Sequence, residues 1–327
     1  MLPRAEWLIE EGIGEHRAAL FDGDRLLAAR LDWREGPTRG LVADALLISR
    51  AKGSSRGTAR FPGGEEALVD RLPADAAEGA TLRLEITRPS LSEGKRRKLA
   101  QARPSTLPPR PAPTLAETLA AEGHAIRTVR RFPGSEWDEL MAEAFAGTIA
   151  FPGGALLLYP TPAMLLVDVD GTLPPARLAL AAVAPLSTAL RRLDAGGSIG
   201  IDFPTLPSRE ERRAVDNALG AALSDWPHER TAMNGFGFVQ LVSRLERPSL
   251  LDRATHRPAA TAARWLLRQA ESLEGAGALL LTIHPALEAQ LRPDWLEALA
   301  RRTGRAIRVE ARRDLAIEGG HAQVVAR

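Results

Sequence analysis

The chain has 327 residues, of which 45% are hydrophobic and 26% charged, with a net charge of +2 and no cysteine. This length can accommodate two or three domains, and the lack of cysteine excludes disulfides and thiolate-bound zinc or iron–sulfur sites. No segment approaches the roughly 20 uncharged apolar residues of a membrane helix. The N-terminal segment carries acids and lacks the apolar core of a signal peptide, so we expect a cytoplasmic protein without a membrane partner.

The basic residues are almost all arginines. Only three of the 43 are lysines, namely Lys52, Lys95 and Lys98. The planar fork of arginine suits phosphate recognition, but a GC-rich genome would enrich arginine as well. The composition therefore permits a nucleic-acid partner without requiring one.

Residues 17–88 contain a run of short apolar strands, punctuated by the turn sequences "DGD" at 22–24 and "PGG" at 62–64. Such a run is typical of a small barrel of the S1 or oligonucleotide-binding (OB) type. We therefore expect a barrel domain over residues 1–102, including an N-terminal extension. The charge run "SEGKRRKLAQAR" at 92–103 is either a solvated segment or an edge of the barrel that contacts phosphates, and the sequence leaves both open.

Residues 103–114 hold five prolines and predict a stiff linker. With the segment up to residue 150 they form a reduced connection to the next domain. From 151 to 252 strand and helix patterns alternate, which predicts a parallel or mixed sheet covered by helices. Its expected elements are strands at 154–159, 163–169, 197–203 and 236–242, a helix at 174–193 kinked by Pro185, and a helix at 208–223 capped by Ser208. Residues 253–327 repeat the alternation and predict a small α/β domain.

Two acidic residues end the strand "AMLLVDVDGT" at 163–172. Asp168 and Asp170 are two residues apart and therefore project to the same face. A right-handed crossover through the helix at 174–193 would bring Asp202, at the end of "GSIGIDF", to the same edge of the sheet. Carboxylates gathered there would repel each other unless a hard cation such as Mg²⁺ joined them. The alternative is that these residues only form turns or helix caps.

The string "DVDGT" also resembles the first motif of the haloacid-dehalogenase-like phosphatases. That chemistry needs a cation downstream of the motif, usually a lysine, but no lysine follows Lys98. It also needs an acidic pair at the end of a later strand, and it normally places the motif on the first strand of the fold. The sequence meets none of these three demands.

Four segments taken together, and in order, resemble the ribonuclease E/G family. They are "FPGGALLLYPTPAMLLVDVDGT" (151–172), "GGSIGIDFPTLPSREERRAVDNAL" (196–219), "NGFGFVQLVSRLERPSL" (234–250) and the barrel region, which includes "GTARFPGGEEALVDRLP" (57–73) and "EGATLRLEITRPSLSEGKRRKL" (78–99). The resemblance covers most of residues 15–325 and is strongest over 151–250. It implies a fold that is α/β plus all-β, with an N-terminal S1/OB-type barrel, a DNase I-like α/β catalytic sheet and a small C-terminal α/β domain.

The resemblance also implies an activity and a set of site residues. The family cleaves single-stranded RNA with Mg²⁺, leaving 5′-phosphate and 3′-hydroxyl ends, and Mn²⁺ could substitute for Mg²⁺. Asp168 and Asp202 match the metal-binding aspartates, and Asp170 takes the place of the asparagine that orients the first of them. The RNA contacts that the resemblance implies are Phe61, Lys95, Arg96, Arg213 and Arg244. Phe61 could equally belong to the core of the barrel.

The chain also departs from the family pattern. Gly235 stands where the family has the arginine of its "RFG" motif, and Thr205 replaces the second aspartate of "IDFID". The Cys-Pro-x-Cys zinc link would fall near residues 251–260, which have no cysteine, so zinc is not expected and a homodimer would need another contact. We find no counterpart of the pocket that senses a 5′-monophosphate. Three hypotheses follow: an Mg²⁺-dependent endoribonuclease, an RNA-binding relative without catalysis and, third, a phosphatase.

Overall fold

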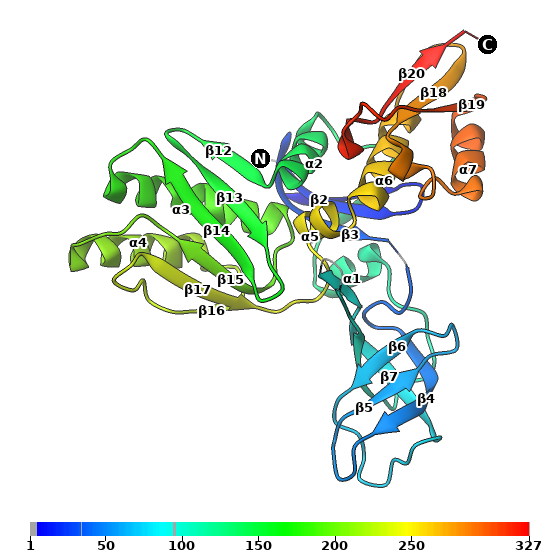
Figure 1. Cartoon of the computed structure of the whole chain (residues 1–327), viewed down its shortest axis with the longest axis horizontal. Coiled ribbons are helices and arrows are strands. Elements are labelled where there is room, and N and C mark those ends of the chain that lie inside the picture. The colour runs from blue at the N-terminus through cyan, green and yellow to red at the C-terminus, as the bar shows by residue number, and fades with distance from the viewer. Residues whose placement is uncertain (1–4, 34, 94–95, 327) are drawn as a thin grey trace.

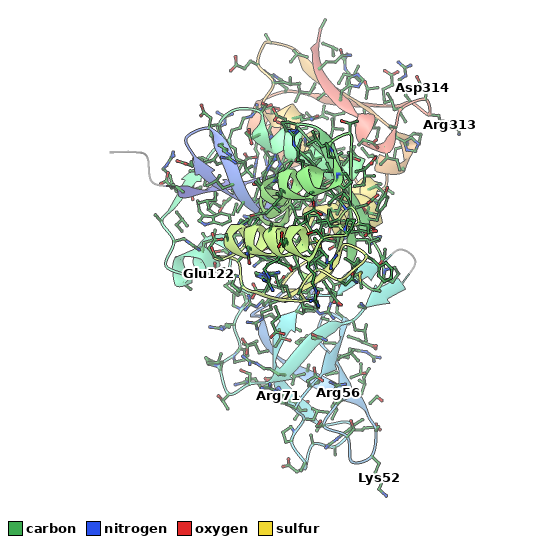
Figure 2. All side chains as sticks on the ribbon, turned by 90° about the vertical axis from the view of Figure 1, so that its left-hand side faces the viewer. Lys52, Arg56, Arg71, Glu122, Arg313 and Asp314 are labelled. Atoms are coloured by element: carbon green, nitrogen blue, oxygen red, sulfur yellow. The ribbon has the colours of Figure 1, made fainter. Side chains whose placement is uncertain are left out.

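The computed structural model describes residues 5–33, 35–93 and 96–326. Its helices and strands form a mixed α/β protein with several sheets, one of which closes into a barrel. Figure 1 shows the barrel, a six-stranded sheet and a C-terminal unit arranged around a small N-terminal sheet. Lys52 and Arg56 of the barrel lie at the opposite end of the molecule from Arg313 of the C-terminal unit (Figure 2).

The N-terminal sheet has the strand order β11-β1-β2-β3. Its strands are β1 (Glu6–Glu11), β2 (His16–Asp22), β3 (Arg25–Asp32) and β11 (Ile126–Val129). β1 to β3 form an antiparallel meander, with Gly23 in the turn that the "DGD" sequence predicts, and β11 adds parallel to β1. The sequence suggested that the strands at 17–33 belong to the barrel, and this prediction was wrong. They form one sheet with β1, whose other neighbour, β11, follows only at residue 126.

The barrel is inserted between β3 and β11. Its five strands close in the order β10-β6-β5-β4-β7 around a core of their own. They are β4 (Val42–Arg50), β5 (Gly57–Arg60), β6 (Glu66–Val69), β7 (Thr81–Arg88) and β10 (Ala100–Pro104), and a small hairpin of β8 (Leu91–Glu93) and β9 (Arg96–Lys98) projects from it. The predicted turn at 62–64 joins β5 to β6. Five strands are also the number found in OB-type barrels.

The segment at 103–150 is more than a connection. After the proline-rich stretch, Thr114 begins α1 (Leu115–Ala121) with a capping box that includes Glu117. The helix packs Leu115 and Leu119 against Trp7 and Ile9 of the N-terminal sheet. β11 then completes that sheet, and α2 (Glu136–Ala146) packs on its other side against the main core. The chain thus returns from the barrel to the sheet that it had left.

The six-stranded sheet has the order β12-β13-β14-β15-β17-β16. Its strands are β12 (Thr148–Phe151), β13 (Gly154–Pro160), β14 (Leu165–Gly171), β15 (Gly197–Asp202), β16 (His228–Arg230) and β17 (Phe238–Ser243), with helices α3 (Pro175–Arg192) and α4 (Arg209–Ala222). β14 and β15 are parallel neighbours joined through α3, as the sequence predicted. α3 is continuous through Pro185, and Ser208 caps α4 as expected.

The two faces of this sheet differ in burial. Val167, Val169, Ile199 and Ile201 are buried in a core that they share with residues of α3 and α4. The alternate residues of the same strands, apart from Gly200, are partly or fully exposed. The sheet therefore has one face covered by helices and one open face.

The C-terminal unit packs around a separate core that includes Ile13 and Trp295. Its sheet has the order β19-β18-β20. The elements are α5 (Leu250–His256), α6 (Pro258–Glu271), β18 (Ala278–Ile283), η1 (Pro285–Leu287), α7 (Pro293–Thr303), β19 (Ile307–Ala311), η2 (Ile317–Gly319) and β20 (His321–Val325). The segment "GALLLTI" closes this core, since Leu279, Leu281 and Ile283 are fully buried in it. Across all described residues, no helix is both long and apolar enough to cross a membrane.

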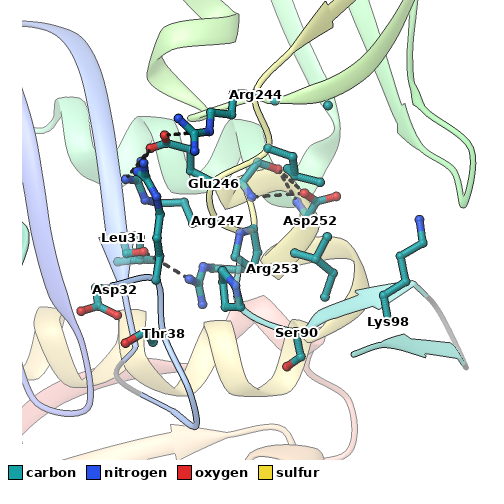
Figure 3. Close-up of a pocket in the computed structure, with 18 of the residues that line it drawn as sticks. Leu31, Asp32, Thr38, Ser90, Lys98, Arg244, Glu246, Arg247, Asp252 and Arg253 are labelled. Carbon is teal, nitrogen blue, oxygen red and sulfur yellow. Dashed lines mark hydrogen bonds and ion pairs between the residues drawn. The ribbon is translucent and has the colours of Figure 1, made fainter. Parts of the chain in front are cut away.

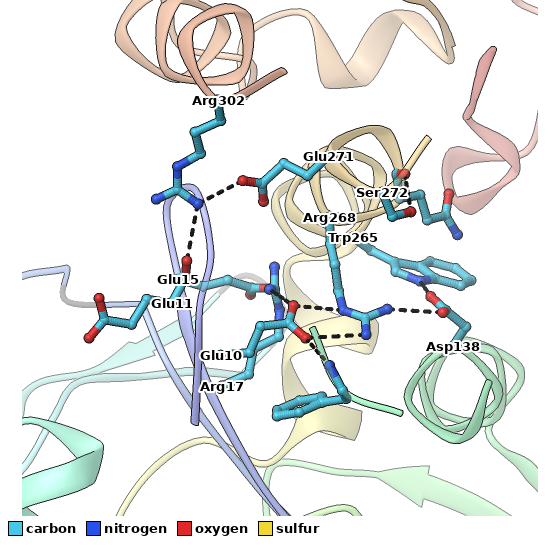
Figure 4. A network of polar contacts seen from close by, with 12 residues as sticks. Glu10, Glu11, Glu15, Arg17, Asp138, Trp265, Arg268, Glu271, Ser272 and Arg302 are labelled. Carbon is cyan, nitrogen blue, oxygen red and sulfur yellow. Dashed lines mark hydrogen bonds and ion pairs between the residues drawn. The ribbon is translucent and has the colours of Figure 1, made fainter. Parts of the chain in front are cut away.

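A buried ionic network joins these parts at Glu10 of β1 (Figure 4). One Glu10 oxygen accepts hydrogen bonds from Arg17 Nη1 at 2.6 Å and Arg268 Nε at 2.9 Å, and the other accepts one from the backbone N–H of Phe132 at 2.9 Å. Arg268, on α6, also donates to Asp138 of α2 at 2.9 Å. Each Glu10 oxygen is therefore paired, as a buried charge requires.

Replacement of Glu10 by glutamine should destabilise the fold. The neutral amide leaves the Arg17 and Arg268 guanidiniums without the charge that they share, and breaking a buried pair costs about 3 kcal/mol or more. The free energy of unfolding, measured by urea denaturation, should fall accordingly. Glu11→Gln is the matched control, since the Glu11 side chain is 63% exposed and such a change costs within about 0.5 kcal/mol. Equal losses in the two variants would contradict the role of the network.

Candidate active site on the open face of the sheet

Two of the predicted acids lie side by side. In the parallel ladder between β14 and β15, Asp168 is the direct register partner of Asp202. Neighbouring strands run about 4.8 Å apart, so the two side chains leave adjacent backbones on the same, open face. Both lie at the carboxyl ends of their strands, where open α/β sheets form their sites.

The surroundings of Asp168 disfavour its charged form. Partial burial, and then the charges of Asp202 and Asp170, raise the pKa of the Asp168 carboxyl. Desolvation and like charges both act in this direction. A group of acids that repel one another and are not neutralised by an arginine is the electrostatic pattern expected of a functional site.

Asp170 lies one pleat further along β14 and is exposed. Its carboxylate accepts a hydrogen bond from the backbone N–H of Gly171 at 2.8 Å. Glycines bring the backbones close together here: a Cβ atom at Gly154 would lie 2.6 Å from the Asp170 carbonyl oxygen, and one at Gly171 would lie 2.4 Å from the Gly153 carbonyl oxygen. Gly153, Gly154 and Gly171 therefore allow β13 to approach the end of β14, the strand that carries Asp168 and Asp170.

The donor set fits a hard divalent cation with few protein ligands. Mg²⁺ is commonly held by one or two carboxylates, with water completing its coordination, and Asp168 and Asp202 could supply such a pair. Within the described ranges, no group of three or more His, Cys, Asp or Glu side chains is arranged to hold a metal ion. Asp168 and Asp202 are register partners, whereas Asp170 lies two residues further along β14, opposite Ala155.

The loop before β17 carries an exposed aromatic ring, two residues before the register partner of Asp202. Asn234 Oδ1 accepts hydrogen bonds from the backbone N–H groups of Phe236 at 2.9 Å and Phe238 at 3.0 Å. Gly237 has φ +93°, and a Cβ atom there would lie 2.3 Å from the Phe203 carbonyl oxygen, so this position requires glycine. Phe238 pairs with Asp202 across the ladder, while the Phe236 side chain is 79% exposed. Sequence analysis missed Phe236, although its motif, "NGFGF", was recognised.

The other residues predicted to bind RNA are scattered. Phe61 is 4% exposed and belongs to the barrel core, so packing supports the core alternative rather than stacking on a base. Lys95 and the side chain of Arg96 fall outside the described residues. Arg213 is exposed on α4, the helix that follows Asp202. Arg244 follows β17 at the end of the sheet opposite the acids, because Ser243 pairs with Gly197, and the structure therefore does not bring it to them.

A cavity of about 1100 Å³ lies at that opposite end, between the barrel and the starts of β14 and β15. It is lined by Arg244 and, from α5, by Arg253. Arg253 was not predicted as a site residue, and no motif points to it. The cavity and the acids are therefore two separate features of the same sheet.

The chain was compared with protein-family models and with curated proteins. No family model matches it, and no curated protein matches it significantly. The likeness to the ribonuclease E/G family therefore stands on the motifs alone.

The raised pKa of Asp168 predicts a pH-dependent effect of Asp168→Asn on stability in the presence of EDTA. Because the folded-state pKa lies above the unfolded one, the folded chain holds more protons in the interval between them, and the stability of the wild type falls as pH rises. Asp168→Asn has no carboxyl at this position and so does not lose stability in this way. The difference in free energy of unfolding, variant minus wild type, should therefore increase as pH rises from about 4 and become constant above the folded-state pKa.

Urea unfolding at a series of pH values measures this effect. Asp202→Asn retains Asp168 and removes the charge that contributes most to its repulsion, so it should weaken the pH dependence. A difference between wild type and Asp168→Asn that does not change with pH would contradict the electrostatic reading of the site.

Proposed function

We propose that the protein is a divalent-metal-dependent endoribonuclease, acting on single-stranded RNA and leaving 5′-phosphate and 3′-hydroxyl ends. The observation that carries the proposal is the register pair of Asp168 and Asp202 on an open sheet face. Support also comes from the ordered set of motifs that resembles the ribonuclease E/G family, and from a closed five-stranded barrel in the same chain. On this proposal the six-stranded sheet is the DNase I-like catalytic unit and the barrel is of the S1/OB type.

Asp168 and Asp202 would hold the cation, for which Mg²⁺ is the first candidate and Mn²⁺ the second. When bound, Mg²⁺ supplies Lewis acidity and lowers the pKa of a coordinated water, which makes that water a better nucleophile toward a phosphodiester. The chain's own part is to hold the two carboxylates adjacent and open to substrate. Their mutual repulsion makes the site prefer a cation.

Asp168→Asn and Asp202→Asn should each abolish cleavage of a fluorescein-labelled, unstructured RNA. Each variant removes one of the two charges that hold the cation, and the loss of a few kcal/mol of transition-state stabilisation lowers the rate about 100-fold or more. The measurement is gel analysis of internal cuts with Mg²⁺ and with EDTA. RNA binding, followed by fluorescence anisotropy, should persist in both variants.

Asp24→Asn is the control for this experiment, because Asp24 is an exposed aspartate in the β2–β3 turn. It should cut RNA at the wild-type rate. Full activity in both site variants would overturn the proposal, as would internal cleavage that is insensitive to EDTA.

A second candidate function is an RNA-binding protein without catalysis. Gly235, in the place of the arginine of the resembled motif, favours it. A Cβ atom at this position would meet nothing within 4 Å, so packing does not require glycine there. The position could hold an arginine, and its glycine therefore counts as the loss of a cation from the resembled motif. RNA binding without metal-dependent cuts by the wild type would decide for this function. Turnover of a generic phosphate ester would instead favour the phosphatase hypothesis.

The exposed ring of Phe236 should contribute to RNA affinity. Base–aromatic stacking is worth about 1–3 kcal/mol per base, so Phe236→Ala should weaken RNA binding about 5-fold to 100-fold. The dissociation constant for a single-stranded oligonucleotide, measured by anisotropy, tests this. Val309→Ala is the control, since Val309 is 43% exposed on the remote strand β19. An unchanged dissociation constant in Phe236→Ala would rule out the stacking contact.

A further inference from the structure

The cavity at the far end of the sheet has walls from several parts of the fold. The barrel and its hairpin contribute Ile86 and Lys98, the connection after β3 contributes Arg39, the β13–β14 turn contributes Met164, and α5 contributes Arg253. Figure 3 shows Arg253 in the middle of this group. Its volume of about 1100 Å³ is sufficient for a small molecule, since ligand sites typically measure roughly 300–1000 Å³.

Arg253 is a buried cation that lacks a carboxylate partner. Its side chain belongs to a residue only 8% exposed. Nη2 donates one hydrogen bond, to the Leu31 carbonyl oxygen at 3.2 Å, and Nε has no partner. Among the described residues, no carboxylate forms an ion pair with it. A buried guanidinium with five N–H donors normally uses more of them.

The neighbouring arginines are differently placed. Arg257 and Arg264 share Glu35, with Arg257 Nη1 at 2.7 Å from one of its oxygens and Arg264 bonded to the other. All three guanidiniums lie over the Trp33 ring, at 4.0–4.7 Å from its centroid. Burial lowers the pKa of Arg253 to about 10, the Glu15 and Asp32 carboxylates oppose this shift, and repulsion from Arg264 and Arg257 adds to it. Arg253 therefore stays charged at neutral pH. Two of the three cations around Trp33 bond to Glu35, whereas the described hydrogen bond of Arg253 reaches only the Leu31 carbonyl oxygen.

Other charges in the cavity are largely committed to each other. Arg39 and Arg247 pair with Glu246 at 2.5 and 3.4 Å, and Arg247 also pairs with Asp194. Asp252 caps α5 through Ser249. Among the described contacts, these pairs leave Arg253 without a bonded carboxylate, and its buried guanidinium retains donors that an external anion could use.

We propose that this cavity binds a phosphate group, with Arg253 as its central ligand. The planar fork of arginine matches two oxygens of a phosphate, and a guanidinium already desolvated gains the most from such a pair. The phosphate could belong to a nucleic-acid strand that crosses from the barrel toward the acids, or to a free nucleotide. The site does not depend on the nuclease proposal, because binding here requires neither metal nor cleavage.

The position of the cavity bears on the source of the phosphate. Met164 lines the cavity, and its sulfur also lies over Gly200 on the open face, because a Cβ atom at Gly200 would be 2.9 Å from it. Gly200 is two residues before Asp202. The Phe238 ring also covers this glycine, because the same Cβ atom would lie 2.5 Å from its Cζ. A nucleic-acid strand that contacted both Arg253 and the acids would therefore cross over Met164 and Phe238.

The test uses the full chain in EDTA at constant ionic strength, because surface arginines attract any anion at low salt. The probes are inorganic phosphate, adenosine monophosphate and a fluorescein-labelled oligouridylate without a terminal phosphate. Arg253→Met removes the charge and retains apolar packing on Trp33, while Arg253→Lys retains the charge and loses the fork. Arg257→Met is the matched control, since Arg257 lines the same cavity and the same ring but has its own carboxylate.

The wild type should bind at least one probe with an affinity that falls tenfold or more in Arg253→Met and less than threefold in Arg257→Met. Loss confined to oligouridylate would assign the phosphate to a nucleic-acid backbone, and loss confined to the small probes would assign it to a free nucleotide or phosphate. If Arg253→Met does not fold, as judged by circular dichroism, Arg253→Lys serves as the test and should show the same selective loss. Equal affinities in the wild type and the Arg253 variants for every probe, or no binding by the wild type, would overturn the proposal.

Discussion

The arrangement of this molecule depends on the burial of one carboxylate, Glu10. Its two oxygens gather Arg17 of β2, Arg268 of α6 and the backbone at Phe132, so the small N-terminal sheet is fixed to the C-terminal unit and to the segment that leads into the six-stranded sheet. Gly12 makes room for this, because a Cβ atom there would lie 2.5 Å from Arg17 Nη1. The chain leaves the N-terminal sheet after β3 to form the barrel and returns to the same sheet at β11. The position of the barrel relative to the acids, and hence the cavity between them, therefore rests on a network that lies far from both. A buried charge of this kind is costly to form and costly to break, which favours a single arrangement of the units.

The six-stranded sheet shows how a stable fold carries an electrostatically unfavourable site. Its helix-covered face is apolar on β14 and β15 and holds these strands in register, and that register is what places Asp168 beside Asp202. The strands cannot slip by one residue without turning Val167 and Ile201 out of the core. The repulsion between the carboxylates is thus imposed by the packing of the opposite face. Among the described residues, no arginine forms an ion pair with Asp168 or Asp202, in contrast to Arg230, which lies beside Asp216 at 3.1 Å.

The sequence predicted best what is local and periodic. The crossover β14–α3–β15 follows from one helix between two apolar strands and the right-handed rule, which is why the pairing of Asp168 with Asp202 was foreseen. The barrel boundary was wrong because alternation of polar and apolar residues identifies a strand but not its sheet, and the partner of β1 returns only at residue 126. α3 runs on through Pro185, and the kink predicted there stays a prediction. Arg253 could not be found in this way, since its position over Trp33 and its hydrogen bond to Leu31 depend on contacts across more than 200 residues.

The departures from the resembled motifs change the charge that the motif residues carry, although not all in the same direction. Asp170 in place of an asparagine adds one negative charge, Thr205 in place of an aspartate removes one, and Gly235 in place of an arginine removes one positive charge. The sum is one unit more negative than the pattern of the family. A more negative site attracts a divalent cation more strongly and an RNA phosphate less strongly. On the proposed function, RNA affinity would then come from contacts that do not depend on charge at the acids, and the exposed ring of Phe236 and the proposed phosphate contact at Arg253 are suited to supply it.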